Sequence, residues 1–152
     1  MSKQRRSQYG IKRVKKAKPL SPALTETLRD AIHDYQNGRL IRAKAGCEKI
    51  LRKSPKTIVA LHYLALILQS EGESMQAVSL MQRAIAADPK EASSWSLFGA
   101  LQQDTGEWSE AIKAYTRALD IDSGLINARH NLAWALLDNA QPDAAKVHFT
   151  LA

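Results

Sequence analysis

Small apolar residues recur along the chain at a constant interval of 34 positions. With units counted from Leu24, Ile58, Ala92 and Ile126, the eighth place holds Ala31, Ala65, Gly99 and Ala133, the twentieth holds Ala43, Ala77, Ala111 and Ala145, and the twenty-fourth holds Cys47, Met81, Tyr115 and Phe149. A fixed period in this range predicts a repeat array, in which each unit completes the burial of its apolar faces by stacking on a neighbour. The small residues would let two antiparallel helices of one unit cross closely, and the larger residue would fill the space beside them.

Capping residues before prolines, together with isolated glycines, divide the array into helices. Ser21-Pro22, Ser54-Pro55 and Asp88-Pro89 each place a capping side chain before a proline, which predicts a helix start. The run 88–91 also reads as a capping box, with Asp in place of Ser or Thr. Helices are expected to end at the glycines that tolerate a left-handed backbone, which are Gly38, Gly72 and Gly106. The eight predicted helices lie at about 21–37, 39–53, 55–71, 73–87, 89–105, 107–121, 123–139 and 141–152.

The composition fits an all-α protein with a core. Hydrophobic residues make up 45% of the 152 positions, too many for a wholly disordered chain. No apolar run reaches the roughly 18–20 residues of a membrane span, and no secretory signal is recognisable. The single cysteine, Cys47, fits a reducing compartment. We therefore expect a cytoplasmic protein, or a nuclear one if the organism is eukaryotic.

The net charge of +7 comes from the N-terminal residues. Positions 1–18 hold eight cations and no acid, so the remainder has 14 cations against 15 acids. Residues 1–19 are expected to form a disordered basic tail, because they combine low hydrophobicity with high charge. Nucleic acid, anionic lipid or an acidic protein would meet the cations of this tail, among them Arg5, Arg6, Lys12, Arg13, Lys15 and Lys16. In a nucleated cell 12–16 would suit a nuclear import signal, and the plainer interpretation is a solvated arm that aids solubility.

The spacing resembles that of the tetratricopeptide repeat family. The third unit holds most of the signature residues, which are Trp95, Phe98, Gly99, Gly106, Ala111, Tyr115 and Ala118. The array departs from the family pattern at Ser123, Arg129, Ala140 and Pro142. The resemblance implies a right-handed α-solenoid of antiparallel helix pairs over 20–152, with units at about 24–57, 58–91, 92–125 and 126–152, the last incomplete. It also implies a non-catalytic scaffold for protein–protein interaction.

Stacked units would form a superhelix whose concave face is lined by the first helix of each unit. Helical spacing places aromatic, amide, imidazole and hydroxyl side chains on that face. The candidate groove residues are Tyr35, His62, Tyr63, Gln69, Ser96, Gln103, Asn127, His130, Asn131 and Trp134. Amides can pair with the backbone of an extended peptide, and aromatic side chains anchor partners. The expected partner is therefore a protein or peptide segment.

The residues that could support catalysis or hold a cofactor do not form a recognisable site. The glycines are isolated and make no GxxxxGK phosphate loop. His62 and His130 lie two units apart, about 20 Å if each unit advances by one interaxial spacing, which is too far for one metal ion. Cys47 occupies the packing place of Met81 and Tyr115, and no buried acid pair is recognisable. We expect no catalytic residue, no metal and no cofactor within these residues.

Two ligand sites known in the family do not match this concave face. Chaperone-binding members hold a terminal carboxylate with Lys, Asn and Arg, whereas the fifth place of the units here is Leu28, His62, Ser96 and His130. Members fused to O-GlcNAc-type glycosyltransferases have asparagines at the sixth place, which here is Arg29, Tyr63, Leu97 and Asn131. Only Asn131 fits the second pattern, which weakens that interpretation without removing it.

Two alternatives to an independent scaffold stay open. The array could be the N-terminal substrate-recruiting region of a larger transferase, such as a sulfotransferase or an O-GlcNAc-type glycosyltransferase. It could also belong to a nucleic-acid-associated or ribosome-associated factor that acts through the basic tail. The last helix leaves apolar surface at Val147, Phe149 and Leu151. We expect that surface to be covered by more chain, by a partner or by self-association.

Overall fold

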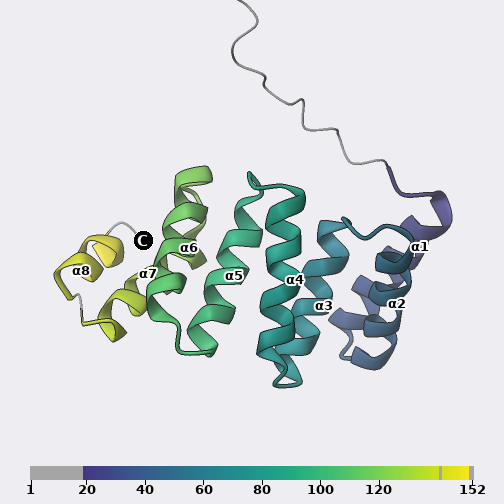
Figure 1. Ribbon diagram of the computed structural model, residues 1–152, viewed down its shortest axis with the longest axis horizontal. Helices are drawn as coiled ribbons and strands as arrows, with labels where there is room; N and C mark the ends of the chain where they lie inside the picture. The colour runs from purple at the N-terminus through teal and green to yellow at the C-terminus, as the bar shows by residue number, and fades with distance from the viewer. Residues whose placement is uncertain (1–18, 141, 151–152) are drawn as a thin grey trace, which may run out of the picture.

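The computed structural model describes residues 19–140 and 142–150, which form eight α-helices and no strand (Figure 1). The helices are α1 (Pro22–Gln36), α2 (Leu40–Lys53), α3 (Ile58–Ser70), α4 (Ser74–Ala87), α5 (Ala92–Asp104), α6 (Trp108–Ile121), α7 (Ile126–Asp138) and α8 (Pro142–Thr150). Each odd-numbered helix packs along the next even-numbered helix, and each pair packs against the following pair. The predicted all-α solenoid of about eight helices is confirmed. None of the described helices has both the length and the apolar character needed to span a membrane.

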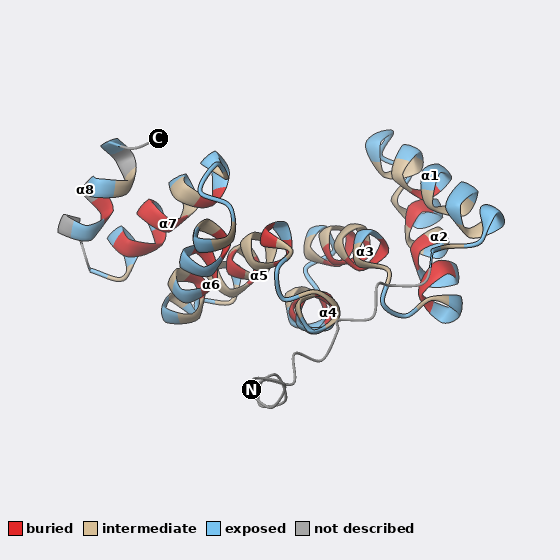
Figure 2. Ribbon diagram, turned by 90° about the horizontal axis from the view of Figure 1, so that it is seen from above, coloured by how far each residue is buried: buried red, intermediate tan, exposed pale blue. Residues whose placement is uncertain are grey.

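The four helix pairs follow an arc with an inner and an outer side (Figure 2). The odd-numbered helices contact one another in succession, α1 with α3, α3 with α5, and α5 with α7. No close backbone contact joins α2 to α4 or α4 to α6 within the described helices. The odd-numbered helices therefore lie together on the inner side of the arc, and the even-numbered helices are spread apart on the outer side.

The recurring small residues lie in the seams between helices. Those at the eighth and twentieth places are buried in all four units. Gly46 shows how closely the helices approach, since a Cβ atom added there would lie only 2.9 Å from the Cβ of Ala31 on α1. The helices of a pair thus meet through positions that have little or no side chain, as the 34-residue period predicts.

The first proline signal begins a helix as predicted. Ser21 is the N-cap of α1, and its side chain accepts a hydrogen bond from the Leu24 N–H at 3.4 Å. Pro22 occupies the first helical position, where its missing N–H costs nothing. No helix precedes this segment among the described residues, so Ser21 is available to cap the one that follows.

The other two proline signals were wrong as helix starts. Ser54 and Asp88 are the C-terminal caps of α2 and α4, because each donates its backbone N–H into the preceding helix. The chain then turns through Pro55 and Pro89, and the N–H three residues after each cap returns to its carbonyl at 3.2 and 3.3 Å. The fixed φ of proline suits the second position of such a turn as well as it suits a helix start. The predicted capping box is likewise replaced, since Glu91 itself is the N-cap of α5.

Three glycines end helices as predicted, and an alanine takes their place after α7. Gly38, Gly72 and Gly106 have φ values of 71°, 82° and 81°. Ala140 has a φ of 57° and is the only non-glycine residue with positive φ in the described part of the chain. A Cβ atom disfavours this backbone conformation, so the departure from glycine at Ala140 places strain at the end of α7.

Several expectations concern positions outside the described residues. The basic tail over 1–18, the last two residues and the side chain of Phe149 all lie there. The disorder of the tail and its contacts with nucleic acid therefore stay predictions. Self-association through α8 also stays a prediction, although Val147 on that helix is exposed.

Candidate functional site

All ten predicted groove residues belong to the four odd-numbered helices, which line the inner side of the arc (Figure 2). We call the surface formed by these ten residues the inner face. Several of its members contact a neighbouring helix, Ser96 is partly buried on α5, and three lie exposed along α7. The structure therefore places the ten residues on the four inner helices without gathering them into one pocket.

An edge-to-face pair of tyrosines joins the first two units of the inner face. The ring centroids of Tyr35 on α1 and Tyr63 on α3 lie 5.1 Å apart, and the rings are inclined at 74°. Such a pair contributes about 0.5–1.5 kcal/mol beyond its burial. Both residues are only partly buried. The pair therefore both stabilises the stacking of α1 on α3 and offers aromatic surface to a partner.

His62 is held by the next unit and is only 18% exposed. Its Nε2 lies 2.7 Å from the Oγ of Ser94, a fully buried residue in the first turn of α5. The Ser94 hydroxyl donates to Oε2 of Glu91 at 2.7 Å, so Nε2–H of the imidazole is the donor to Ser94. Glu91 also accepts from the backbone N–H groups of Ser93 and Ser94. We call His62, Ser94 and Glu91 the His62 network, which ties α3 to α5.

The surroundings of the His62 network favour a neutral imidazole beside an ionised carboxylate. Burial lowers the pKa of His62 below its ordinary value, and the Glu91 carboxylate 3.7 Å away offsets this only in part. Burial alone would raise the pKa of Glu91, but hydrogen bonds from Ser94 and Ser93 outweigh it and hold that pKa below its ordinary value. The serine hydroxyl donates to the carboxylate and not to the imidazole. The network is therefore not a serine nucleophile activated by a histidine base.

Three predicted groove amides also hold neighbouring helices together. The side chain of Gln69 on α3 donates to Asp104 at the end of α5. The Tyr115 hydroxyl donates to Oε1 of Gln103 at 3.1 Å, and Asn131 hydrogen-bonds the same phenol. Burial raises the pKa of Tyr115 above its ordinary value, the Asn131 bond opposes this, and the charge of Asp104 adds to it. These amides already have partners within the solenoid.

An exposed row of side chains follows one face of α7. Asn127, His130, Trp134 and Leu137 are spaced three or four residues apart, so they share one side of the helix. We call these four residues the α7 stripe. Trp134 is 55% exposed and is the only exposed aromatic residue in the described part of the chain, and Leu137 is 37% exposed. The opposite side of α7 is buried through Ala128, Leu132, Ala135 and Leu136.

Sequence reasoning alone did not find Ser94 and Glu91, and it did not select Leu137. Glu91 was recognisable as an acid at a helix start, but it was assigned to a capping box that began at Asp88. No sequence signal pairs His62 with Ser94, because they lie 32 positions apart in different units. Ser96, which was predicted for the groove, is partly buried on α5.

The remaining candidates for catalysis or metal binding are the single cysteine and the acidic and imidazole side chains of the described residues. Cys47 is fully buried, and burial is the main cause that raises the pKa of its thiol to about 11. The reactive thiolate is therefore disfavoured there. Among residues 19–140 and 142–150, no three His, Cys, Asp or Glu side chains lie close enough together to hold a metal ion.

The chain matches one protein-family model over residues 36–118, which is more than half of its length. The family is described as "Anaphase-promoting complex, cyclosome, subunit 3", and it is a family of tetratricopeptide-repeat type. The matched region extends from the last residue of α1 into α6, and so covers the middle helix pairs.

Among curated proteins, the chain is similar to a peroxisomal targeting signal receptor of Candida glabrata. The two are 31% identical over 70 residues, which is 46% of this chain. The chain covers 12% of that receptor, so the similarity concerns a short part of a much longer protein.

Among solved structures, the chain is similar to an O-GlcNAc transferase of Thermobaculum terrenum, with a TM-score of 0.71 and 27% identity. That match covers 74% of this chain and 22% of the transferase chain. It is also similar to the first tetratricopeptide-repeat domain of Spaghetti (RPAP3) bound to an HSP90 peptide. There the TM-score is 0.73 at 19% identity, over 77% of this chain and 93% of that domain.

The arc of helix pairs, the buried small residues at a 34-residue period and the family match all agree. They confirm the predicted resemblance to tetratricopeptide repeats, and both solved relatives share the fold. The chain therefore belongs to the tetratricopeptide-repeat family described as "Anaphase-promoting complex, cyclosome, subunit 3".

Proposed function

We propose that the inner face binds an extended segment of a partner protein and that the α7 stripe is its anchor. The exposure of Trp134 is the observation that carries this proposal, because aromatic residues dominate the binding energy of many interfaces. Leu137 lies one turn further along α7 and extends the apolar contact. Asn127 and His130 add donors and acceptors that can pair with the backbone of an extended segment.

The names of two similar proteins support a peptide-like partner. One solved relative is described with a bound HSP90 peptide, and the curated relative is described as a receptor for a targeting signal. The fifth-place residues of this chain include neither Lys nor Arg, since they are Leu28, His62, Ser96 and His130. We therefore favour a segment that is recognised along its length over one held by a terminal carboxylate.

The way in which the histidine and cysteine side chains are packed supports a non-catalytic module. The His62 network and Cys47 are used in packing between helices. The one cysteine is unpaired as well as buried, which supports a reducing compartment such as the cytoplasm. In this proposal the repeats position a partner, and any reaction takes place on another protein or domain.

The similarity to the Thermobaculum terrenum transferase supports a second candidate, in which the repeats recruit substrate for a transferase domain of a longer protein. The sixth-place residues weigh against an asparagine ladder, because Asn131 is the only asparagine among them and it is bonded to Tyr115. Sequencing the gene through and beyond codon 152 tests this candidate. A reading frame that continues into a transferase domain is expected, and a stop codon at that point ends it.

Peptide display tests the first candidate. The full chain would be used to select binders from a random peptide library, and their affinities would be measured by fluorescence anisotropy. Substitution Trp134→Ala is expected to lower the affinity for the selected peptides by about ten-fold or more, as for an interface hot spot. Asn127→Ala should cause a smaller loss.

Met75→Ala is the matched control, because Met75 is a large apolar residue that is 71% exposed on α4, outside the inner face. It should leave the affinities within about two-fold. The inner face would be rejected if the selected peptides bound Trp134→Ala and Asn127→Ala as tightly as they bind the unaltered chain.

A further inference from the structure

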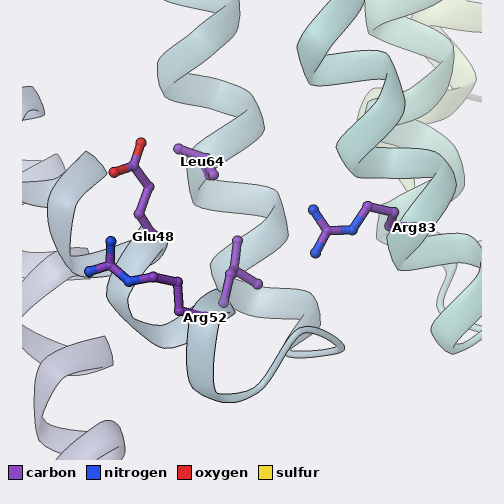
Figure 3. A pocket seen from close by; sticks show the side chains of 5 residues that line it. Glu48, Arg52, Leu64 and Arg83 are labelled. Atoms are coloured by element: carbon purple, nitrogen blue, oxygen red, sulfur yellow. The ribbon is translucent and has the colours of Figure 1, made fainter.

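A groove crosses the outer side of the arc between α2 and α4, and its floor is formed by α3 with one residue each from α2 and α4. Two adjoining hollows of about 390 and 470 Å³ share Glu48 and Leu64. Figure 3 shows Glu48 and Arg52 on one side of the first hollow, Arg83 on the other side, and Leu64 on the helix between them. We call this feature the outer groove, and its lining is Lys44, Glu48, Leu51, Arg52, Leu64, Leu68, Gln76, Ser79, Leu80 and Arg83.

The floor of the outer groove is made of leucines. Leu51, Leu64, Leu68 and Leu80 retain 8%, 7%, 6% and 8% exposure, so each presents some surface at the bottom of the groove. Apolar side chains of a ligand would lose contact with water on this floor, which is the main source of affinity in most protein interfaces. The absence of close contact between α2 and α4 leaves the floor accessible along these described helices.

Two arginines stand at one end of the groove. The Arg83 side chain donates to the backbone carbonyl of Pro55 at 3.2 Å, which holds the guanidinium at the rim while other N–H groups remain available. Neither Arg52 nor Arg83 forms an ion pair within the described residues. Guanidinium groups on both sides of an apolar floor favour a ligand that carries several carboxylates.

The charge around the groove is unlike that of the remaining solenoid. Positions 39–56 hold seven cations and one acid, whereas positions 57–152 hold six cations and eleven acids. Within the part of the chain that the structure describes, two of the seven cations are ion-paired, Arg39 with Asp34 and Lys44 with Glu71. A concentrated positive field of this kind attracts an acidic partner and speeds its association.

The combination of a leucine floor and two arginines is not found one repeat further along the chain. One period further on, Phe98 stands where Leu64 stands here, and Ala86 stands where Arg52 stands. Phe98 is larger than leucine and packs edge-to-face against Trp95 at a centroid distance of 6.4 Å. Only Arg83 has a cationic equivalent there, Arg117. The leucine floor with two arginines therefore does not simply repeat along the solenoid.

We propose that the outer groove is a second docking site, which takes an acidic segment of a partner protein that carries leucine-sized apolar side chains. The apolar side chains lie on the leucine floor, and separate carboxylates of the segment lie at Arg52 on one side and at Arg83 on the other. Nucleic acid fits less well, because no aromatic residue in the lining could stack a base and Glu48 repels phosphate. With the inner face on the opposite side of the arc, the scaffold would hold two partners at once.

The test is a selection from a random peptide library against the full chain, followed by anisotropy measurements of the selected peptides. We expect a class of peptides that is rich in Asp, Glu and Leu. Its affinity should fall about ten-fold or more in the double variant Arg52→Glu/Arg83→Glu and stay within about two-fold in Trp134→Ala. Arg117→Glu is the matched control for charge, because Arg117 has the register of Arg83 without the groove lining, and it should have little effect.

Leu64→Phe tests the floor without changing charge, because it places at this position the residue that the next unit already has. The substitution should lower the affinity for the same acidic peptides. Helical circular dichroism and the melting temperature check that the chain stays folded. The proposal is overturned if no acidic class is selected, if the acidic peptides keep their affinity in the double variant, or if they lose it in Trp134→Ala. A single-stranded oligo-dT probe of about 20 nucleotides tests nucleic acid as the ligand. The proposal is also overturned if the affinity for this probe falls in the double variant while the affinity for the acidic peptides does not.

Discussion

A Cβ atom added to Gly99 of α5 would lie 2.8 Å from Cε1 of Tyr115 on α6, so the bare α-carbon makes room for the tyrosine ring. Tyr115 is fully buried, and its hydroxyl is bonded to Gln103, which keeps the ring from moving aside. The first two units have alanine at the same register place, together with the smaller Cys47 or the flexible Met81 at the twenty-fourth place. The third unit therefore needs glycine at position 99 because it has the bulky Tyr115 at the facing position.

Substitution Gly99→Ala is expected to lower the free energy of unfolding by about 1–3 kcal/mol, because the added methyl group overpacks the seam. The better helix propensity of alanine would return at most about 1 kcal/mol of this. Urea unfolding followed by circular dichroism measures the change. In a Tyr115→Leu background the same substitution should cost clearly less, and an equal cost in both backgrounds would show that the ring is not the cause.

Substitution Ala140→Gly is expected to raise the free energy of unfolding by about 0.5–1 kcal/mol. Glycine removes the strain of a left-handed backbone at φ 57°, and part of that gain is offset by the greater entropy of the unfolded chain. Thermal unfolding of the full chain measures it. Gly106→Ala, at the equivalent place in the third unit with φ 81°, should lower the melting temperature. A lower melting temperature for Ala140→Gly would contradict the assigned backbone conformation.

The stability of the fold should depend on pH through His62. The folded-state pKa of His62 lies below its ordinary value of 6.5, so near that pH the unfolded chain binds more protons than the folded chain. The stabilisation is therefore fully present above pH 6.5 and is lost as the pH falls through 6.5 toward the folded-state value. Glu91 acts in a separate window, because its lowered pKa gives stabilisation that is lost only as the pH falls below 4.5.

Denaturant unfolding at a series of pH values checks the prediction for His62. His62→Gln keeps an N–H donor for Ser94 but does not titrate, so its stability should change less between pH 6.5 and the Glu91 window. His33→Gln is the control, since His33 is an exposed histidine on α1 outside the network. A profile that flattens with His33→Gln and not with His62→Gln would reject the role of the network.

Cys47 should resist alkylation in the folded chain. Its side chain is fully buried, and its pKa is raised to about 11, so the thiolate that reacts is scarce near neutral pH. Iodoacetamide is expected to modify it at a rate that follows local or global opening, and rapidly in urea. The double variant Cys47→Ala/Ala45→Cys moves the thiol to an exposed position on the same helix and should react at once. Fast modification of Cys47 without denaturant would contradict its burial.

The repeat itself could be predicted because it depends on residues that act locally or at a fixed interval. Ala43, Ala77 and Ala111 show the period without any knowledge of their neighbours, and Gly72 ends a helix through its own backbone freedom. The proline signals were harder to interpret, because the role of the capping residue depends on what precedes it in the fold. Ser21 caps α1, whereas the similar Ser54 closes α2, and the difference depends on whether a helix precedes the signal.

By itself, the sequence determined the 34-residue register, the all-α class and the helices that line the inner side of the arc, because side-chain volume and helical spacing are properties of the chain. Only the tertiary structure decided which polar groove residues have partners inside the molecule. His62 and Gln69 bond to residues of another unit, and those pairings arise when helices distant in sequence are stacked. The outer groove is likewise a consequence of stacking, because the curvature that brings α3 close to α5 spreads α2 from α4.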